Sequence, residues 1–205
     1  HENRPPDPIG YDLFFGGGDY DQDLLATGIS IELDGRRVTI PATDPIDIPA
    51  KVLAEVYPEP AIGGRLLYRE DLRWVGVALS SFGIVYNRQV IEMLGVGEPQ
   101  TWSDLQDGCY RNWLALADPG HSSSIAVTYN TILRRHGWEE GWNILRRIFA
   151  NARYFAVNSA KVPVDVSQGE AAAGMCIDFY GRFQAGAIGS EARVGYVDPR
   201  HMTAT

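Results

Sequence analysis

Three serines in a row follow an aspartate, a proline, a glycine and a histidine in the segment DPGHSSS, residues 118–124. An apolar run, WLALA, precedes this segment, and a stretch with helical spacing follows it. The first N–H groups of a helix have no partner inside the helix, and its dipole favours a negative charge there. One serine is enough to cap a helix, so Ser122, Ser123 and Ser124 leave spare donors. The segment predicts either a plain helix cap or a contact with an anion.

Three other polar or glycine-rich segments also follow apolar runs, where open α/β sheets bind ligands. The first, Gly16-Gly17-Gly18, allows a tight turn or a ligand lying against the main chain. The second is Ser80-Ser81. The third holds Asp178 and Tyr180, which share a face if the strand continues through them. This pair predicts either a metal or polar-ligand site, or side chains that bond neighbouring backbone.

Catalytic chemistry has weaker support in the sequence. His121 has the character of a general base, but a solvated loop histidine is favoured because no nucleophile, base and orienting group occur together. Ser80 and Ser81 lack the glycine frame of a nucleophile elbow. Cys109 and Cys176 lie far apart, without a CxxC or Cys/His cluster, so we expect two ordinary buried thiols and no metal or cofactor.

The chain has 205 residues, a net charge of −8 and a pI of about 5.0. This balance argues against binding to nucleic acid or to an anionic membrane surface, both of which need positive charge. It leaves a small anionic ligand open, because a pocket can be locally positive on a negative protein. No apolar run approaches the ~18 residues of a membrane-spanning helix.

Periodicity and turn residues predict an alternation of strands and helices, which is typical of an α/β fold with a substantially parallel sheet. Residues 36–72 are rich in proline and glycine and predict an irregular excursion with one helical turn near AKVLAEVY. Trp138 and Trp142 fall on one helical stripe and are expected in the core. The predicted strands are residues 9–15, 73–79, 82–87, 113–118, 170–180 and 193–199, and the predicted helices are 19–28, 88–95, 122–137, 137–152 and 162–169.

Six segments in one order carry a family resemblance that covers nearly the whole chain. They resemble bacterial extracellular solute-binding proteins of ABC importers, in the branch that includes ferric-ion, phosphonate and sugar-phosphate binders. The segments are DLFFGGGDYDQDLLATG, RWVGVALSSFGIVYN, EPQTWSDLQD, LALADPGHSSS, GWEEGWNILRRIFANARYFAVNSAKVPVDVSQGEAAAGMCIDFY and VGYVDP.

The resemblance implies a two-lobed, type II periplasmic-binding-protein-like fold that grips a solute in a cleft and delivers it to a membrane permease. It implies no catalysis and no cofactor. Residues 1–88 would form part of lobe one and the first crossover, 89–192 lobe two, and 193–205 the return crossover. The location implied is periplasmic or extracellular, with a lipid anchor in the full-length protein. The implied ligand-binding residues are Gly16, Gly17, Gly18, Ser80, Ser81, Ser122, Ser123, Ser124, Asn158, Asp178 and Tyr180.

Two departures from the family pattern refine this expectation. Ferric binders of this branch carry a carboxylate in the first strand-end loop and paired tyrosines in the late one, where this chain has Gly16–Gly18 and Phe179-Tyr180. A ferric ion prefers several anionic oxygens, so a phosphorylated or carboxylated solute is favoured. The alternatives are a ferric-ion binder, an enzyme acting on phosphoesters through His121, Asp178 and Tyr180, and a sensory domain.

The second departure is length. Family members usually have another strand and helix before residue 9 and several helices after residue 200. Lobe one is therefore expected to be incomplete, and exposed sheet edges would pair with a second copy of the chain to form a homodimer.

Overall fold

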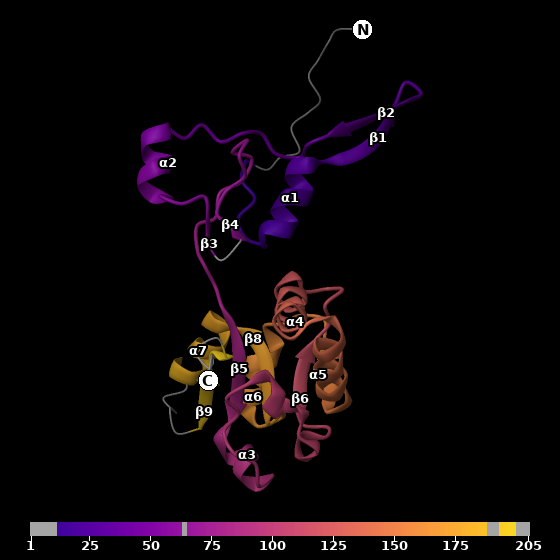
Figure 1. Ribbon diagram of the computed structural model, residues 1–205, viewed down its shortest axis with the longest axis vertical. Coiled ribbons are helices and arrows are strands. Elements are labelled where there is room, and N and C mark those ends of the chain that lie inside the picture. Colours follow the sequence, from indigo (N-terminus) through magenta and orange to yellow (C-terminus); the bar gives the residue numbers. More distant parts are fainter. Residues whose placement is uncertain (1–11, 63–64, 188–192, 200–205) are drawn as a thin grey trace. The chain divides into compact units, whose positions relative to one another are not determined.

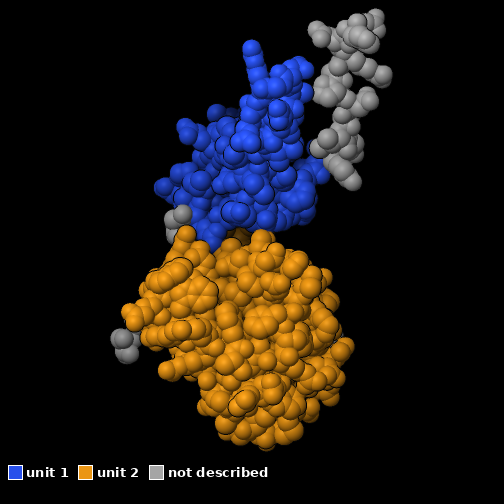
Figure 2. Space-filling model, turned by 90° about the vertical axis from the view of Figure 1, so that its right-hand side faces the viewer, with its two compact units in different colours: residues 1–76 blue, residues 77–205 orange. Residues whose placement is uncertain are grey.

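The computed structural model describes residues 12–62, 65–187 and 193–199. The chain divides into two compact units, residues 1–76 and residues 77–205 (Figure 2). The core of the protein lies in the second unit, which carries the larger sheet.

Unit 1 has a thin core. Among its described residues, only Ala26 and Trp74 are buried apolar side chains. Polar contacts add to this packing: the Trp74 indole donates to the Asp23 carboxylate at 2.7 Å, and Arg65 pairs with Asp19 at 2.7 Å. Its elements are α1 (Asp19–Thr27), β1 (Ile29–Leu33), β2 (Arg36–Ile40), α2 (Ala50–Val56), β3 (Ala61–Ile62) and β4 (Arg65–Leu66) (Figure 1).

A β-hairpin in unit 1 corrects the prediction of an irregular excursion from residue 36. Strands β1 and β2 pair antiparallel, with Ile29 opposite Ile40. The turn between them is Asp34-Gly35, both with positive φ (49° and 71°). An Asp-Gly pair between alternating apolar residues is a strong hairpin signal, so this element was detectable in the sequence. Helix α2 confirms the helical turn expected in AKVLAEVY.

Two predicted strands are wrong in the part that the structure describes. Residues 12–15 are irregular, and Phe15 is 76% exposed; residues 9–11 lie outside the described ranges. Of residues 73–79, only Val75 makes a β-bridge, to Tyr68. Both segments have apolar strand-like composition, but a strand forms only where a neighbouring strand supplies a ladder of hydrogen bonds.

Unit 2 is built on a five-stranded sheet in the order β7-β6-β8-β5-β9. Strand β6 is parallel to both β7 and β8, and β5 is antiparallel to its neighbours β8 and β9. Four strands therefore run one way and β5 runs the other way, which confirms a substantially parallel sheet. The strands are β5 (Phe82–Asn87), β6 (Leu114–Ala117), β7 (Ala152–Ala156), β8 (Ala173–Ile177) and β9 (Val194–Val197).

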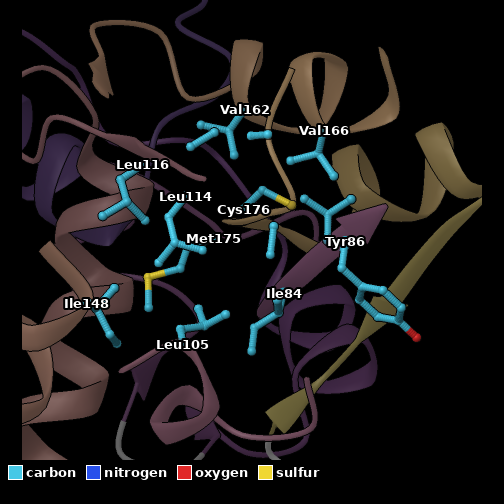
Figure 3. Close-up of a cluster of buried hydrophobic side chains, with 14 of the residues drawn as sticks. Ile84, Tyr86, Leu105, Leu114, Leu116, Ile148, Val162, Val166, Met175 and Cys176 are labelled. Carbon is cyan, nitrogen blue, oxygen red and sulfur yellow. The ribbon is translucent and has the colours of Figure 1, made fainter. Parts of the chain in front are cut away.

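Helices cover both faces of this sheet. Figure 3 shows Val162 and Val166 on the Cys176 side of β8, and Leu105 and Ile148 on the Met175 side. Figure 1 shows β5 running from the upper end of unit 2 to α3 at its lower end. The helices are α3 (Arg88–Met93), α4 (Ser123–His136), α5 (Trp138–Ala150), α6 (Lys161–Gln168) and α7 (Asp178–Ala187), with short 3₁₀ turns η1 (Trp102–Gln106) and η2 (Gly108–Tyr110).

A glycine at the centre of the sheet lets α6 approach closely. A Cβ atom on Gly174 of β8 would lie 2.4 Å from Val162 Cγ1 and 2.6 Å from the carbonyl oxygen of Ala115. Both distances are shorter than any real contact, and the second involves backbone that cannot rotate away. The small side chains of the run AAAGMC thus allow α6 and β6 to pack closely against β8.

The helices predicted in unit 2 are confirmed. Two predictions of side-chain burial are wrong. Trp138 is 73% exposed rather than in the core, because the buried face of α5 begins at Gly141 and continues through Ile144, Leu145 and Ile148. Cys109 is exposed on η2, whereas Cys176 is buried in β8 as expected. Both thiols are free, so they do not form a disulfide with each other.

We expect the Gly174→Ala variant to lose about 1–3 kcal/mol of unfolding free energy, since the added methyl group overpacks the contact between α6 and β8. Urea denaturation followed by circular dichroism measures this loss. The matched control is Gly97→Ala, where a Cβ meets nothing within 4 Å. Equal stability of the two variants would contradict the packing described here.

Candidate functional site

One edge of the sheet of unit 2 gathers most of the residues singled out in the sequence. Strands β6, β7, β8 and β9 end at this edge, and the antiparallel β5 begins there. We call it the carboxyl edge. Backbone hydrogen bonds tie its loops together: Asp118 N–H donates to Ala156, and Asp178 N–H donates to Ser81, both at 2.9 Å.

The carboxyl edge brings together eight of the eleven predicted ligand-binding residues. They are Ser80, Ser81, Ser122, Ser123, Ser124, Asn158, Asp178 and Tyr180. The other three, Gly16, Gly17 and Gly18, belong to unit 1 and lead into α1.

Ser122 caps helix α4, and Ser123 and Ser124 are the first two residues of the helix. The Ser122 hydroxyl accepts the Ile125 N–H at 3.5 Å, the limit of a hydrogen bond, and lies 3.1 Å from the Ser124 hydroxyl. The Tyr129 hydroxyl donates to the carbonyl of Ala117 at 3.0 Å and anchors α4 to the end of β6. All three serines remain partly accessible, so they are available to a ligand.

Three helices begin at the carboxyl edge. Helix α4 starts after β6, α6 starts shortly after β7, and α7 starts directly after β8. The Asn158 carboxamide oxygen accepts the Ala160 N–H at 2.9 Å just before α6 begins. The three helix dipoles place partial positive charge at this edge, which favours an anion although the chain is acidic. The N–H groups that open α6 are already engaged, because Lys161 and Val162 donate to the carbonyls of Asn158 and Ser159.

The late strand is shorter than predicted, which changes the geometry of Asp178 and Tyr180. Strand β8 ends at Ile177, and both residues lie in the first turn of α7. Two residues apart on a helix they point about 200° apart, so they do not share a face. The Asp178 carboxylate accepts the Phe179 N–H at 2.9 Å and places a negative charge at the start of α7.

The glycine run in unit 1 forms a turn into α1. Gly16 and Gly17 have positive φ, 120° and 72°, which other residues rarely adopt. The Gly18 N–H donates to the Asp21 carboxylate at 3.0 Å, and the Gln22 side chain donates to the Gly16 carbonyl at 2.5 Å. The turn explains why glycines stand here; a ligand contact at these residues stays a prediction.

An Asp–His pair lies beside the serines. His121 Nδ1 is 2.8 Å from one oxygen of Asp118, and the Gly120 N–H donates to the other at 2.8 Å. These two contacts, the backbone one first, hold the pKa of the Asp118 carboxyl below its usual range. The pair therefore holds a negative charge within the loop.

Two buried hydroxyls occur at the foot of α7. Ser81 is 5% exposed, and neither its hydroxyl nor that of Tyr196 makes a well-formed hydrogen bond within the described residues. The two groups are close neighbours: burial raises the pKa of Tyr196, while the Ser81 hydroxyl lowers it. The Tyr196 ring fits between Gly83 and Gly181, where no side chain would leave room for it.

Sequence reasoning singled out Asp178 but missed that an aspartate recurs at the carboxyl edge. Asp118, Asp178 and Asp198 each follow the last residue of a parallel strand, and Asp198 is buried. The signal was an apolar run ending in aspartate, present three times. Within residues 12–62, 65–187 and 193–199, no group of three or more His, Cys, Asp or Glu could hold a metal ion.

Comparison with known proteins identifies the family. The family model described as bacterial extracellular solute-binding protein matches residues 54–195. The chain belongs to this family. It follows that the location of such a protein is the periplasm or the outside of the cell.

Solved structures show that this solute-binding protein has part of a type II periplasmic-binding-protein fold. It aligns with AfuA of Actinobacillus pleuropneumoniae, solved with fructose-6-phosphate bound, at TM-score 0.53 and 18% identity over 58% of this chain and 36% of AfuA. It aligns with iron-bound HitA of Pseudomonas aeruginosa at TM-score 0.55 and 19% identity over 75% of this chain and 48% of HitA. At such identity the likeness shows the fold alone.

A curated relative has a higher sequence identity than these two structures, but the alignment covers a smaller share of both chains. The solute-binding protein is 29% identical over 106 residues to the phosphoglycerate transport regulatory protein PgtC of Salmonella typhimurium, which covers 52% of this chain and 27% of PgtC. The matched part thus spans about a quarter of the curated relatives' length. In the ranges that the structure describes, no helix is long and apolar enough to cross a membrane.

The Asp118–His121 pair gives a pH prediction. We expect the Asp118 carboxyl to titrate below ~3.9, the usual value for Asp, so the pair stabilises the fold above that pH and is lost as pH falls through the lowered pKa. Carbon-detected NMR titration of the carboxyl group measures this value. His121→Ala should raise the pKa of Asp118 only in part, because the Gly120 N–H remains.

Asp107 is the internal control for that titration, since the Cys109 N–H lowers its pKa independently of His121. An Asp118 that titrates in the ordinary range would show that the loop is not held as described.

Proposed function

We propose that this chain captures a small anionic solute, phosphorylated or carboxylated, for import by an ABC transporter. The observation that carries the proposal is the start of three helices at one edge of a sheet, beside Ser122, Ser123 and Ser124. Membership of the solute-binding family supports the transport role. The solute would be handed to a membrane permease, and the protein would act by binding rather than by catalysis.

A ferric ion is the alternative solute, and one neighbour in fold is an iron-bound protein. The carboxyl edge supports it less well. Among the described residues there, Tyr180 is the one exposed phenol, and two of the three aspartates are engaged: Asp118 bonds Gly120 and His121, and Asp178 bonds the Phe179 N–H. A hard ferric ion needs several free anionic oxygens at once.

The rest of the proposal concerns the whole protein. We also propose that residues 1–88 form part of a first lobe and its crossover, residues 89–192 a second lobe, and residues 193–205 a return crossover. A lipid anchor in the full-length protein is proposed as well. The eleven predicted residues remain the proposed binding set, including Gly16, Gly17 and Gly18 in unit 1.

The binding proposal is tested by thermal unfolding against inorganic phosphate, glucose 6-phosphate, citrate and ferric citrate. A solute at 100 times its Kd adds about 2.7 kcal/mol of stability, a visible shift in Tm. We expect a shift with the phosphate or carboxylate compounds. A shift with ferric citrate and not with citrate would instead favour the iron alternative.

Variants at the serines connect binding to the carboxyl edge. We expect Ser124→Ala to weaken anion binding about tenfold, since a hydrogen bond to a charged group contributes about 1.5–3 kcal/mol. Isothermal titration calorimetry gives the Kd values. Thr131→Ala is the matched control, because Thr131 is an exposed hydroxyl on the same helix that bonds the Val127 carbonyl. Equal Kd values for both variants would remove α4 from the site.

Self-association is also part of the proposal. The hairpin β1–β2 has one apolar face, formed by Ile29, Ile31, Leu33, Val38 and Ile40, and most of it is exposed. Such a face supports pairing with a second copy. Light scattering at rising concentration should show a dimer that the Val38→Glu change weakens. A monomer at all concentrations would contradict it.

A further inference from the structure

Two tryptophans at the start of α5 line an open hollow on the surface of unit 2. The rings of Trp138 and Trp142 lie 5.7 Å apart between centroids and stand at 79° to each other. Together with Glu139 and Arg146 they line a space of about 480 Å³. We call these four residues the tryptophan hollow. Its volume falls in the range of about 300–1,000 Å³ that is usual for small-molecule sites.

Packing inside unit 2 explains only one of the two rings. The buried face of α5 begins at Gly141 and ends at Ile148, and Trp142 packs partly against the same core. Trp138 is 73% exposed, and its ring contacts that of Trp142. A single exposed apolar side chain needs no explanation. Two large rings beside charged groups in one hollow form a surface of the kind that binds a ligand.

The hollow is separate from the carboxyl edge. Helix α4 begins at that edge with Ser123, and its 14 residues span about 20 Å before α5 starts. The two tryptophans therefore lie at the far end of α4 from the three serines. The inference drawn from the hollow does not depend on the anionic solute proposed above.

The polar groups of the hollow include both donors and acceptors. Within the described part of the chain, no hydrogen bond or ion pair engages either indole N–H or the Glu139 carboxylate. The Arg146 guanidinium donates to the carboxamide oxygen of Asn143, and its other N–H groups remain available. One carboxylate and one guanidinium give the lining no net charge.

This lining disfavours ions and large partners. A site with one charge of each sign has no preference for an anion or a cation. A folded protein partner needs a much larger surface, because a stable interface uses about 20–30 residues on each side. The hollow therefore fits a small, neutral ligand that has both an apolar face and hydrogen-bonding groups.

We propose that the tryptophan hollow binds one pyranose unit of a neutral glycan chain. A pyranose ring has an apolar C–H face that packs on an indole, and its hydroxyls both donate and accept hydrogen bonds. Those hydroxyls match the Glu139 carboxylate, the Arg146 guanidinium and the indole N–H groups. Because the hollow is open, the units on either side of the bound one continue into solvent.

The test is a titration with three neutral glycans, maltohexaose, cellohexaose and N-acetylchitohexaose, followed by two-dimensional NMR of the indole N–H groups. At least one glycan should shift the signals of Trp138 and Trp142 saturably. The signals of Trp74 and Trp102 should stay in place, because both side chains are buried. Glucose alone should bind about tenfold more weakly than that glycan, since it fills the hollow without its neighbouring units.

Variants connect the shifts to the hollow. Trp138→Ala should weaken glycan binding about tenfold, and Glu139→Gln, which keeps the shape of the side chain, about threefold. Both side chains are exposed, so circular dichroism should show wild-type folding. Phe183→Ala is the matched control, because Phe183 is a 66% exposed ring on α7 outside the hollow. It should bind the glycan as the wild type does.

Four results would overturn the proposal. They are no shift with any of the three glycans, unchanged affinity in Trp138→Ala, equal affinity for glucose and the glycan, and stronger shifts of the same signals by a neutral hexapeptide of serine and asparagine. The last result would assign the hollow to a peptide. Loss of phosphate binding at the serines would leave this proposal standing, because the two sites lie at opposite ends of α4.

Discussion

The close packing of α6 on β8 at Gly174 is the constraint on which the rest of unit 2 depends. With no side chain at this position, Val162 and the Ala115 backbone approach to distances that any Cβ would prevent. The central strand is therefore held on one side by a helix and on both edges by β6 and β5. Because the strands are fixed in this register, their ends form one edge, and the loops that follow them are neighbours.

The carboxyl edge is proposed to bind an anion, although the chain is acidic. The protein carries a net charge of −8, and three of its aspartates follow the ends of strands at the carboxyl edge. Two of them have local partners: Asp118 bonds Gly120 and His121, and Asp178 bonds the N–H that follows it. With these charges engaged by their own loops, the helix starts and serine hydroxyls are the groups left to meet a solute.

Much of unit 2 could be predicted from sequence because its signals are local. The apolar spacing of Ile125, Tyr129 and Ile132 defines α4, and Gly169 in a left-handed conformation ends α6. Thr101 and Asp104 have the spacing of a capping box, and in the structure they open a 3₁₀ turn. The order of the six family-like segments then indicated a known fold for these elements.

The errors came where local signals and long-range pairing disagree. Residues 12–15 and 73–79 have strand-like composition, yet whether such a run forms a strand depends on a partner elsewhere in the chain. The end of β8 was misplaced because Asp178, Phe179 and Tyr180 continue a run that reads as one strand, whereas in the structure they open α7, whose Gly181 packs on Tyr196. That contact lies between residues 15 positions apart and cannot be seen in either segment alone.

The position of β5 between β8 and β9 also has a consequence for biosynthesis. Phe82 pairs with Ile177, so β5 is made on the order of 90 residues before its first partner strand. At about 5–20 residues per second, the segment FGIVYN waits on the order of ten seconds at the ribosome with both edges unpaired. During that time the strand lacks both of its partners and is open to wrong pairing.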